Sequence, residues 1–279
     1  MAFTFSQVYY SNVLLRQLRT KLVFGKVASY NQTVGQIVRG GSVQVLTPSA
    51  VATAPYAGSL SFTSITAAPT TVTISETTSF ALELSAVSAA AITPELEQGA
   101  VENTIDDGAY RMAKDIDNYI ASLYVNAGDT FTWSAALDES NILKFVGQVR
   151  DRLELIGALG QDSWLVLPSV CGSILSNATA KLYHTDVTGA TADVGAGLVT
   201  QFMGLNIFTS PAVVTSTTPA GYNVMYGGRN GLGCAMSLSK LTYDDLWPVA
   251  HGTGVAGLTI FGAAAVQPSA LGSLEITVA

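Results

Sequence analysis

The strongest constraint on the fold is a long run of apolar residues at helical spacing between residues 93 and 125. Steps of three and four residues place these side chains on one face of an α-helix; they are Leu96, Ala100, Ile105, Ala109, Met112, Ile116, Ile120 and Leu123. Thr93 suits the N-cap position and Pro94 the first helical position. A helix of about 32 residues is about 48 Å long at 1.5 Å per residue. Such a rod argues against an all-β architecture.

The outer face of this predicted helix is acidic. Two basic residues, Arg111 and Lys114, stand against seven carboxylates, which are Glu95, Glu97, Glu102, Asp106, Asp107, Asp115 and Asp117. Two explanations stay open, a solvated helix face or a surface that receives a basic segment. Gly99 and Gly108 each weaken a helix by about 1 kcal/mol, and we expect them to permit a bend.

The charges are segregated along the chain. Five of the 13 basic residues but none of the 20 acidic residues lie in the first 75 positions, so the two parts carry +5 and −12. Residues 6–24 read as an amphipathic arm with Leu14, Leu18 and Leu22 near one helical face. A basic arm gains docking direction from an acidic neighbour or a polyanion. The candidate contacts between subunits are Arg16, Arg19, Lys21, Lys26 and Arg39 with Glu95, Glu97, Glu102, Asp106 and Asp107.

Residues 41–75 contain no charged side chain and are rich in Ser, Thr, Ala and Val. Alternation typical of strands occurs at 37–46, 61–65 and 71–75, which predicts a long two-stranded excursion. An isolated hairpin is marginal in water, so we expect it to lie on something, such as another subunit. A Ser/Thr-rich linker is the alternative, and the β-branched alternation argues against it.

Helical and strand patterns alternate between residues 131 and 246, which indicates an α/β unit. The predicted helices run from Asp138 to Gly160, from Pro168 to Leu175 and from Gly195 to Met203; short strands are predicted at 164–167, 205–209 and 224–226. The last 30 residues return to strand patterns.

Composition points to a chain that hides much of its surface. Charged residues make up 12% of the chain, hydrophobic residues 48%, and the mean hydropathy is +0.37. No run reaches the about 18 apolar residues of a membrane-spanning helix, and the N-terminus lacks a signal-peptide pattern. Three basic residues in the arm are few for binding a membrane surface. We therefore expect burial against copies of the same chain.

A search for catalytic, metal or cofactor sites predicts none. Two cysteines, Cys171 and Cys234, form no disulfide framework and indicate buried thiols in a reducing compartment. Two groups, His184 with Asp186 and Asp244 and Asp245 with His251, lack metal-ligand spacing. The glycine-rich segment 227–233 lacks the Lys-Ser/Thr ending of a phosphate loop, so it predicts a turn. We therefore expect that the chain is not an enzyme and binds no cofactor.

Several short stretches, taken in order, carry a family resemblance. They are Leu15–Arg19, Val38–Val45, Ala113–Ile120, Trp164–Pro168, Gly204–Ser210 and Phe261–Pro268. Each stretch is weak alone, but their order over nearly the whole chain resembles the major capsid proteins of tailed bacteriophages with the HK97 fold.

The resemblance implies an α+β fold with five parts. These are an N-terminal arm at 1–40, an E-loop hairpin at 41–80, a peripheral domain with a long spine helix at 81–130, an α/β axial domain at 131–246 and peripheral-domain strands at 247–279. Two positions depart from the family pattern, since Gly41 stands where an acidic residue is common and Gln267 where Arg often precedes Pro.

The resemblance also implies function. We expect a virion shell protein that assembles with itself in the host cytoplasm into hexamers and pentamers of an icosahedral head around double-stranded DNA. Portal, scaffolding and decoration proteins are the further expected partners, DNA contact is expected to be non-specific, and no membrane is involved. Residues 41–75 contain no Lys, so no covalent crosslink is expected at the E-loop. The alternatives are an encapsulin-like compartment and a tail-tube or adhesin protein.

Overall fold

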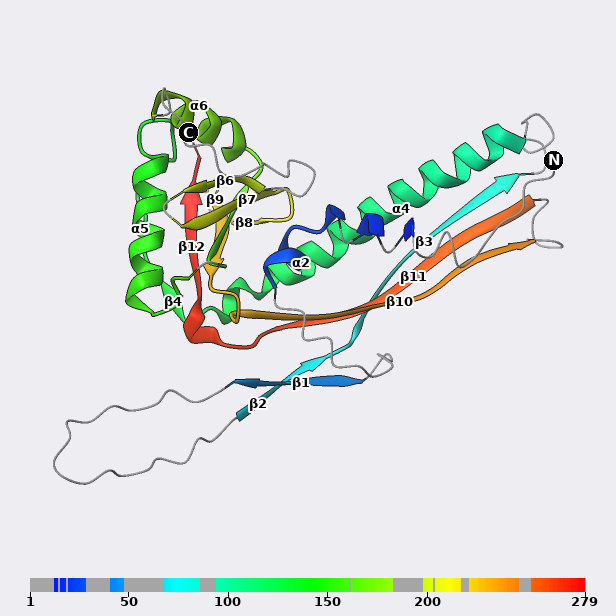
Figure 1. Cartoon of the computed structure of the whole chain (residues 1–279), viewed down its shortest axis with the longest axis horizontal. Helices are drawn as coiled ribbons and strands as arrows, with labels where there is room; N and C mark the ends of the chain where they lie inside the picture. Colours follow the sequence, from blue (N-terminus) through cyan, green and yellow to red (C-terminus); the bar gives the residue numbers. More distant parts are fainter. Residues whose placement is uncertain are drawn as a thin grey trace.

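The computed structural model has an elongated part built on one long helix and a rounded part built on a seven-stranded sheet (Figure 1). The structure describes residues 13–14, 16–18, 20–28, 41–47, 68–85, 94–160, 162–182, 198–202, 204–216, 221–245 and 252–278. The long helix is α4 (Pro94–Ser122), followed by the 3-10 helix η1 (Leu123–Asn126). The predicted spine helix is therefore confirmed, and the α+β fold with it.

The elongated part pairs α4 with a three-stranded antiparallel sheet. The strands run in the order β10 (Leu232–Asp245), β11 (Gly252–Ala265) and β3 (Glu76–Ser85). The apolar stripe of α4 is buried at Ile105, Met112 and Ile116. Thr78 of β3 donates from its hydroxyl to Asp115 of α4 at 2.8 Å, which ties the strand to the helix.

Gly108 has a packing role that the sequence did not reveal. It was expected to weaken α4 and permit a bend, but the ring of Phe80 on β3 occupies the space that a side chain at 108 would need. The cost of glycine within the helix is therefore offset by close contact between the helix and the sheet.

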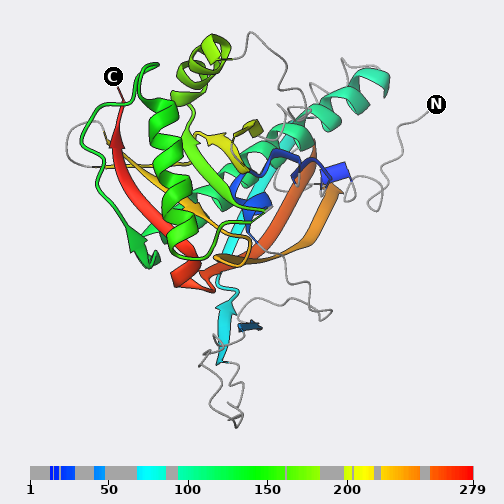
Figure 2. The ribbon, with the colours of Figure 1, turned by 60° about the vertical axis from the view of Figure 1, so that its left-hand side comes forward.

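The rounded part contains the seven-stranded sheet and two helices. Its strand order is β4 (Asp129–Thr130), β12 (Leu271–Thr277), β9 (Gly221–Gly227), β5 (Trp164–Pro168), β7 (Leu205–Ser210) and β6 (Leu198–Phe202), while β8 (Val214–Thr215) pairs with β9. Helix α5 (Ile142–Leu155) lies across one face of this sheet and packs against α6 (Cys171–Leu182) (Figure 2). Every residue of β5 is buried, as its apolar sequence predicts.

Several local predictions differ from the structure. The helix expected at 195–203 is instead strand β6, because Gly204 with φ +79° turns the chain so that β6 pairs with β7. Pairing with a neighbouring strand outweighs local helix preference there. Helix α5 ends at Leu155, before Gly157 with φ +68° rather than at Gly160. Helix α6 begins at Cys171, because Pro168 completes β5.

The last strands divide between the two parts. Strand β11 lies between β10 and β3, whereas β12 lies between β4 and β9 in the other sheet. The sheet partners thus differ from the sequence boundary at 247, since β10 belongs with β11 and β12 joins the sheet of the predicted axial unit. Strand patterns alone contain no information about partners.

The predicted hairpin is confirmed at its base, and its tip lies outside the described residues. Strand β1 (Ser42–Thr47) pairs antiparallel with β2 (Ala68–Thr73). Val72 and Ile74 form a small second core with Ile260 and neighbouring apolar side chains. The chain crosses β11 at Gly262, where a Cβ would stand 2.1 Å from the carbonyl oxygen of Thr73. Only glycine permits this crossing without a shift of backbone.

Candidate assembly surfaces

The arm segment, which we define as residues 13–28, packs on the spine helix of its own chain. Its described residues between 13 and 21 are helical, and the short helix α2 (Phe24–Val27) follows. Leu14, Leu18 and Leu22 are 0% exposed and belong to the same core cluster as the stripe of α4. The predicted apolar face of the arm is therefore confirmed, and its cover is α4.

One predicted pair of opposite charges meets within the chain. Lys21 Nζ lies 2.7 Å from Asp106 Oδ1 and donates to the backbone oxygen of Asp106 at 3.1 Å. The same ammonium lies 5.9 Å from the ring centroid of Tyr110. Because both side chains are partly exposed to water, the ion pair is worth about 0–1 kcal/mol and orients the arm more than it stabilises it.

Asp117 does not lie on the acidic outer face of the helix, where the sequence predicts it. The residue is 4% exposed and contacts the arm segment. The backbone N–H groups of Val23 and Gly25 donate to Asp117 Oδ2 and Oδ1 at 2.8 and 3.2 Å. The side chain of Val23, at the N-cap position of α2, contains no hydrogen-bond acceptor for the N–H groups of the first turn. Asp117 supplies this acceptor instead. The available signal was the four-residue spacing from Ala113 through Asp117 to Ala121, whose two alanines are also buried.

Burial and hydrogen bonding act in opposite directions on Asp117. Removal from water raises the pKa of Asp117 to about 7, while the backbone donors of residues 23–25 and the charge of Lys26 lower it. Desolvation is the larger cause, because it penalises the charged form of a carboxyl group.

The remaining predicted contact residues differ in their exposure. Arg16 and Lys26 are exposed, Glu102 is half-buried, and Asp107 pairs with Arg111 one turn later on α4 at 2.8 Å. Arg19 and Arg39 lie outside the described residues, as do the side chains of Glu95 and Glu97. The structure therefore brings together Lys21 and Asp106 from the predicted set, and it does so within one chain.

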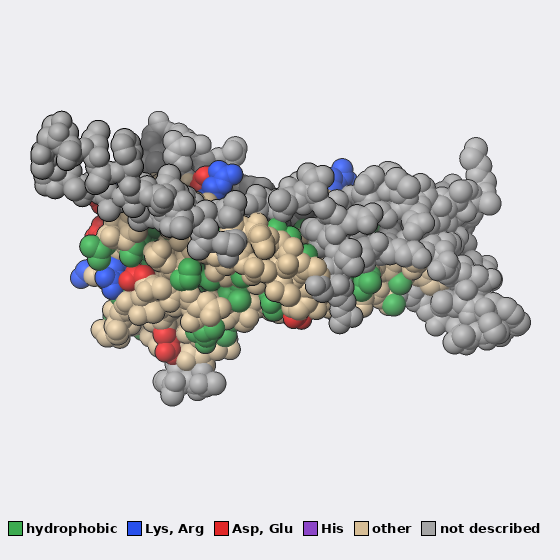
Figure 3. Space-filling view, turned by 90° about the horizontal axis from the view of Figure 1, so that it is seen from below, with side chains coloured by type: hydrophobic (Ala, Val, Ile, Leu, Met, Phe, Trp, Pro, Cys, Tyr) green, Lys and Arg blue, Asp and Glu red, His purple; other side chains and the backbone are tan. Residues whose placement is uncertain are grey.

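On the face of the three-stranded sheet that points away from α4, the exposed side chains that the structure describes on β3 and β11 are uncharged. They are Thr77, Ser79, Ala81 and Leu258, and Leu258 pairs with Ser79. Viewed from below, the described surface shows more hydrophobic and neutral polar atoms than charged ones (Figure 3). Such a face can meet a protein neighbour without removing many charges from water.

The two parts of the molecule are joined by backbone hydrogen bonds where three connections meet. Gly128, after α4, donates to the carbonyl oxygens of Pro268 and Leu271 at 2.9 and 3.1 Å. Gly228, after β9, donates to Ala270 at 3.0 Å. The indole of Trp164 adds a 3.1 Å bond to the carbonyl oxygen of Gly228. These bonds hold the connections around η3 (Pro268–Ala270) at fixed spacing.

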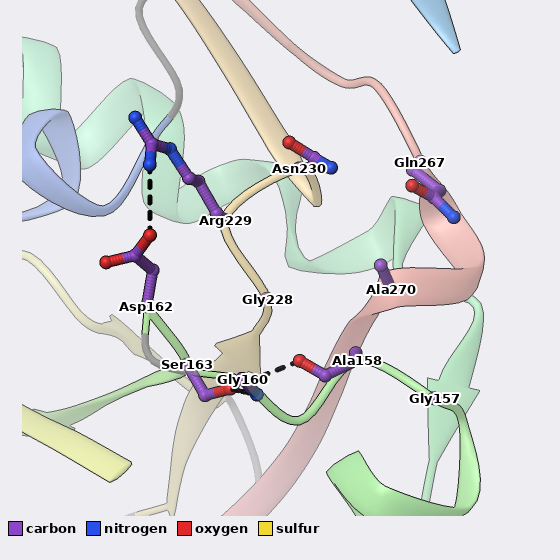
Figure 4. A pocket seen from close by; sticks show the side chains of 10 residues that line it. All are labelled: Gly157, Ala158, Gly160, Asp162, Ser163, Gly228, Arg229, Asn230, Gln267 and Ala270. Carbon is purple, nitrogen blue, oxygen red and sulfur yellow. Dashed lines mark hydrogen bonds and ion pairs between the residues drawn. The ribbon is translucent and has the colours of Figure 1, made fainter. Parts of the chain in front are cut away.

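A cavity of about 350 Å³ opens beside this junction (Figure 4). The glycine-rich segment 227–233 forms one wall as the turn between β9 and β10, which confirms the predicted turn. Arg229, the one basic residue of the lining, donates to Asp162 at 3.0 Å. Ser163 accepts from the N–H of Gly160 and donates to the carbonyl oxygen of Ala158. Arg229 and Ser163 are thus each hydrogen-bonded to other residues of the lining.

Within the described part of the chain, no three His, Cys, Asp or Glu side chains are grouped to hold a metal ion. His184, Asp186 and His251 lie outside that part, as do the side chains of Asp244 and Asp245. Burial raises the pKa of the Cys171 thiol to about 11 and that of Cys234 to about 12, so both thiols are protonated at neutral pH. None of the described helices is long and apolar enough to span a membrane.

Comparison with known proteins finds likeness in structure rather than in sequence. No family model matches the chain, and no curated protein sequence matches it. A chain from Mycobacterium phage Che8 is 16% identical with a TM-score of 0.66, and the match covers 91% of this chain and 90% of that one. The capsid structure of Cyanophage P-SCSP1u gives 13% identity and a TM-score of 0.60 over 92% and 89%.

A third match comes from outside the phages. A virus-like particle from Pyrococcus furiosus gives 10% identity and a TM-score of 0.56 over 96% of this chain and 98% of that one. At such low identities the matches establish the fold alone, over nearly the whole length of the chain. The chain therefore has the HK97-like fold of phage capsid proteins.

Proposed function

We propose that this chain is a capsid shell protein of a tailed phage. In this proposal it assembles with itself into hexamers and pentamers of an icosahedral head that encloses double-stranded DNA. The observation that carries the proposal is the match of over 90% of the chain to phage capsid structures with TM-scores up to 0.66. The low charge content and the neutral outer face of β3 and β11 support association between copies.

The parts of the fold have distinct roles in this proposal. The seven-stranded unit meets its copies around a local symmetry axis, and α4 with its three-stranded sheet forms the shell wall. The hairpin of β1 and β2, whose base crosses β11 at Gly262, reaches over a neighbouring subunit. Many weak contacts of this kind sum to a stable shell, and each of them is reversible during assembly.

The position of the arm segment on α4 indicates which of its residues can contact a neighbouring subunit. The buried residues that the structure describes in the arm segment cover α4 of the same chain, so we infer that contacts of the arm with neighbours are made by its exposed basic side chains, such as Arg16. Contact with packaged DNA is non-specific in this proposal, because a chain with net charge −7 releases few counterions from a polyanion. Portal, scaffolding and decoration proteins are the further partners we propose.

Sedimentation velocity of the purified full-length chain, combined with electron microscopy, tests the proposal. We expect closed particles, or rings of five and six subunits, at moderate ionic strength. If the chain alone stays monomeric, co-expression with the neighbouring structural genes of its source tests assembly again. A monomer in both experiments would contradict a shell function.

A second candidate is an encapsulin-like compartment that holds a protein cargo. The specific observation in its favour is the match to the virus-like particle from Pyrococcus furiosus over 96% of this chain. The contents of native particles separate the two candidates, because long nuclease-protected DNA supports a phage head and a single packaged protein supports a compartment. No observation on the described residues favours the tail-tube or adhesin alternative.

A further inference from the structure

The contact between the arm segment and α4 contains a buried carboxyl group whose burial depends on the arm. Asp117 is the one acidic residue among the buried residues of the described chain. Both of its oxygens accept backbone N–H groups of the arm, from Val23 at 2.8 Å and Gly25 at 3.2 Å. Lifting the arm from α4 would therefore remove these donors and admit water to the carboxyl group.

The groups around Asp117 act in opposite directions on its charge. Three backbone N–H groups of the arm, from residues 23–25, and the charge of Lys26 favour the ionised form, and removal from water favours the protonated form more strongly. On β10 the titratable neighbour is Cys234, whose thiol is buried and neutral. Lys21 is held by Asp106 about three turns earlier on α4. Desolvation is the largest of these influences, because burial costs a carboxylate more free energy than it costs the neutral carboxyl group.

We propose that docking of the arm segment on α4 takes up a proton at Asp117, so that the arm is a strap that loosens as the pH rises. The linkage runs between two states of the same chain, the arm docked and the arm lifted. Only the docked state shields Asp117 from water. The proposal concerns one subunit and does not depend on the shell function.

The direction of the pH dependence follows from the two states. With the arm lifted, the pKa of Asp117 returns toward its ordinary value of 3.8, and with the arm docked it is raised to about 7. Between these values the docked state holds a proton that the lifted state lacks, so each rise in pH weakens docking. Above the upper value both states are ionised, and docking is then at its weakest and independent of pH.

Hydrogen–deuterium exchange of the full-length chain, read by mass spectrometry, measures this directly. Peptides that cover residues 22–28 report docking after correction for the intrinsic pH dependence of amide exchange. We expect their protection factor to fall by up to about tenfold per pH unit from about pH 5 to about pH 7, and then to level off. Peptides from β5 provide an internal reference in the rounded part.

Two variants identify the responsible group. Asp107→Asn removes an exposed carboxylate from the same helix, and we expect it to keep the pH dependence of the unmodified chain. Asp117→Asn cannot titrate, and we expect its arm protection to be independent of pH. A protection factor of the unmodified chain that does not change with pH would overturn the proposal, as would a slope that survives in Asp117→Asn.

In Asp117→Asn an amide nitrogen replaces one carboxylate oxygen, and it cannot accept a hydrogen bond from the N–H of Val23 or Gly25. The arm of this variant can therefore fail to dock. Carbon-13 NMR of the Asp117 carboxyl group in the unmodified chain then decides the question. A titration midpoint near 7 supports the proposal. A midpoint at or below the ordinary aspartate value would show that the backbone donors outweigh desolvation and would refute it.

Discussion

The ring of Phe80 on β3 lies directly over Gly108 on α4, with its Cγ only 2.7 Å from the position that a Cβ of residue 108 would take. The same ring covers Gly257 on β11, where a Cβ would stand 2.4 Å from Cε1 of Phe80. Two glycines from different elements thus form the slot for one aromatic ring. The distance between the spine helix and its sheet depends on both of them.

Gly108→Ala should therefore destabilise the chain, although alanine is the better helix former. The added methyl group must displace the ring or the helix, and overpacking of this kind costs about 1–3 kcal/mol, against about 1 kcal/mol gained in helix propensity. Chemical denaturation measures the net loss. Gly147→Ala in α5 is the matched control, because nothing lies within 4 Å of its Cβ position, and it should stabilise the chain. Equal effects of the two changes would contradict the slot.

Gly262→Ala should displace the base of the hairpin from β11. Its Cβ would stand 2.1 Å from the backbone oxygen of Thr73, which cannot move without the rest of β2. We expect faster hydrogen exchange at residues 68–74 and a loss of assembly. Gly172→Ala serves as the comparison, since its nearest neighbour is a Thr209 methyl group at an ordinary 3.8 Å. Unchanged exchange in the Gly262 variant would disprove the steric argument.

Neutralising Arg16, Arg19 and Lys21 together with Gln should weaken assembly without unfolding the subunit. The ion pair of Lys21 with Asp106 is partly exposed and contributes at most about 1 kcal/mol to the subunit. Sedimentation velocity at low and moderate salt reads assembly, and thermal unfolding reads the subunit. Replacing Lys114, Lys144 and Arg229 with Gln removes the same charge from other exposed positions and should have less effect. Normal assembly of the arm variant would argue against the role of the arm.

Tyr226→Phe should lower the stability of the rounded part. The hydroxyl of Tyr226 donates to Asp129 Oδ2 at 2.6 Å, and the buried ring fills the space above Gly272. A hydrogen bond to a charged group is worth about 1.5–3 kcal/mol, so the variant should unfold at a lower temperature. Tyr110→Phe keeps the aromatic face near Lys21 on a side chain that is 50% exposed, and it should change the stability by less than about 0.5 kcal/mol.

Particles boiled in denaturant should run on a gel as a single monomer band. Residues 41–75, which include the hairpin strands β1 and β2, contain no Lys that could form an isopeptide bond. We therefore expect the proposed shell to be held together by non-covalent contacts. A ladder of multimers in the same gel would refute this expectation and would indicate a crosslink elsewhere in the chain.

Local patterns were sufficient where one face of an element meets a core. The helical periodicity of α4, the leucines of the arm and the apolar sequence of β5 each contain the information that fixes their burial. Local patterns failed where the position of an element depends on a segment that is distant in the sequence. Residues 198–202 have no local reason to be a strand until β7 lies beside them, and Asp117 reads as a surface residue until the arm covers it.

Residue patterns alone specified the α+β class, the spine helix, the amphipathic arm and the presence of a neutral hairpin. These depend on spacing and on charge, which are properties of neighbouring residues in one chain. Contacts between distant segments fix three further features: the arm lies on its own α4, Lys21 meets Asp106 within one subunit, and β11 and β12 belong to different sheets. Those outcomes depend on which distant surfaces exclude water together, and no local pattern specifies that choice.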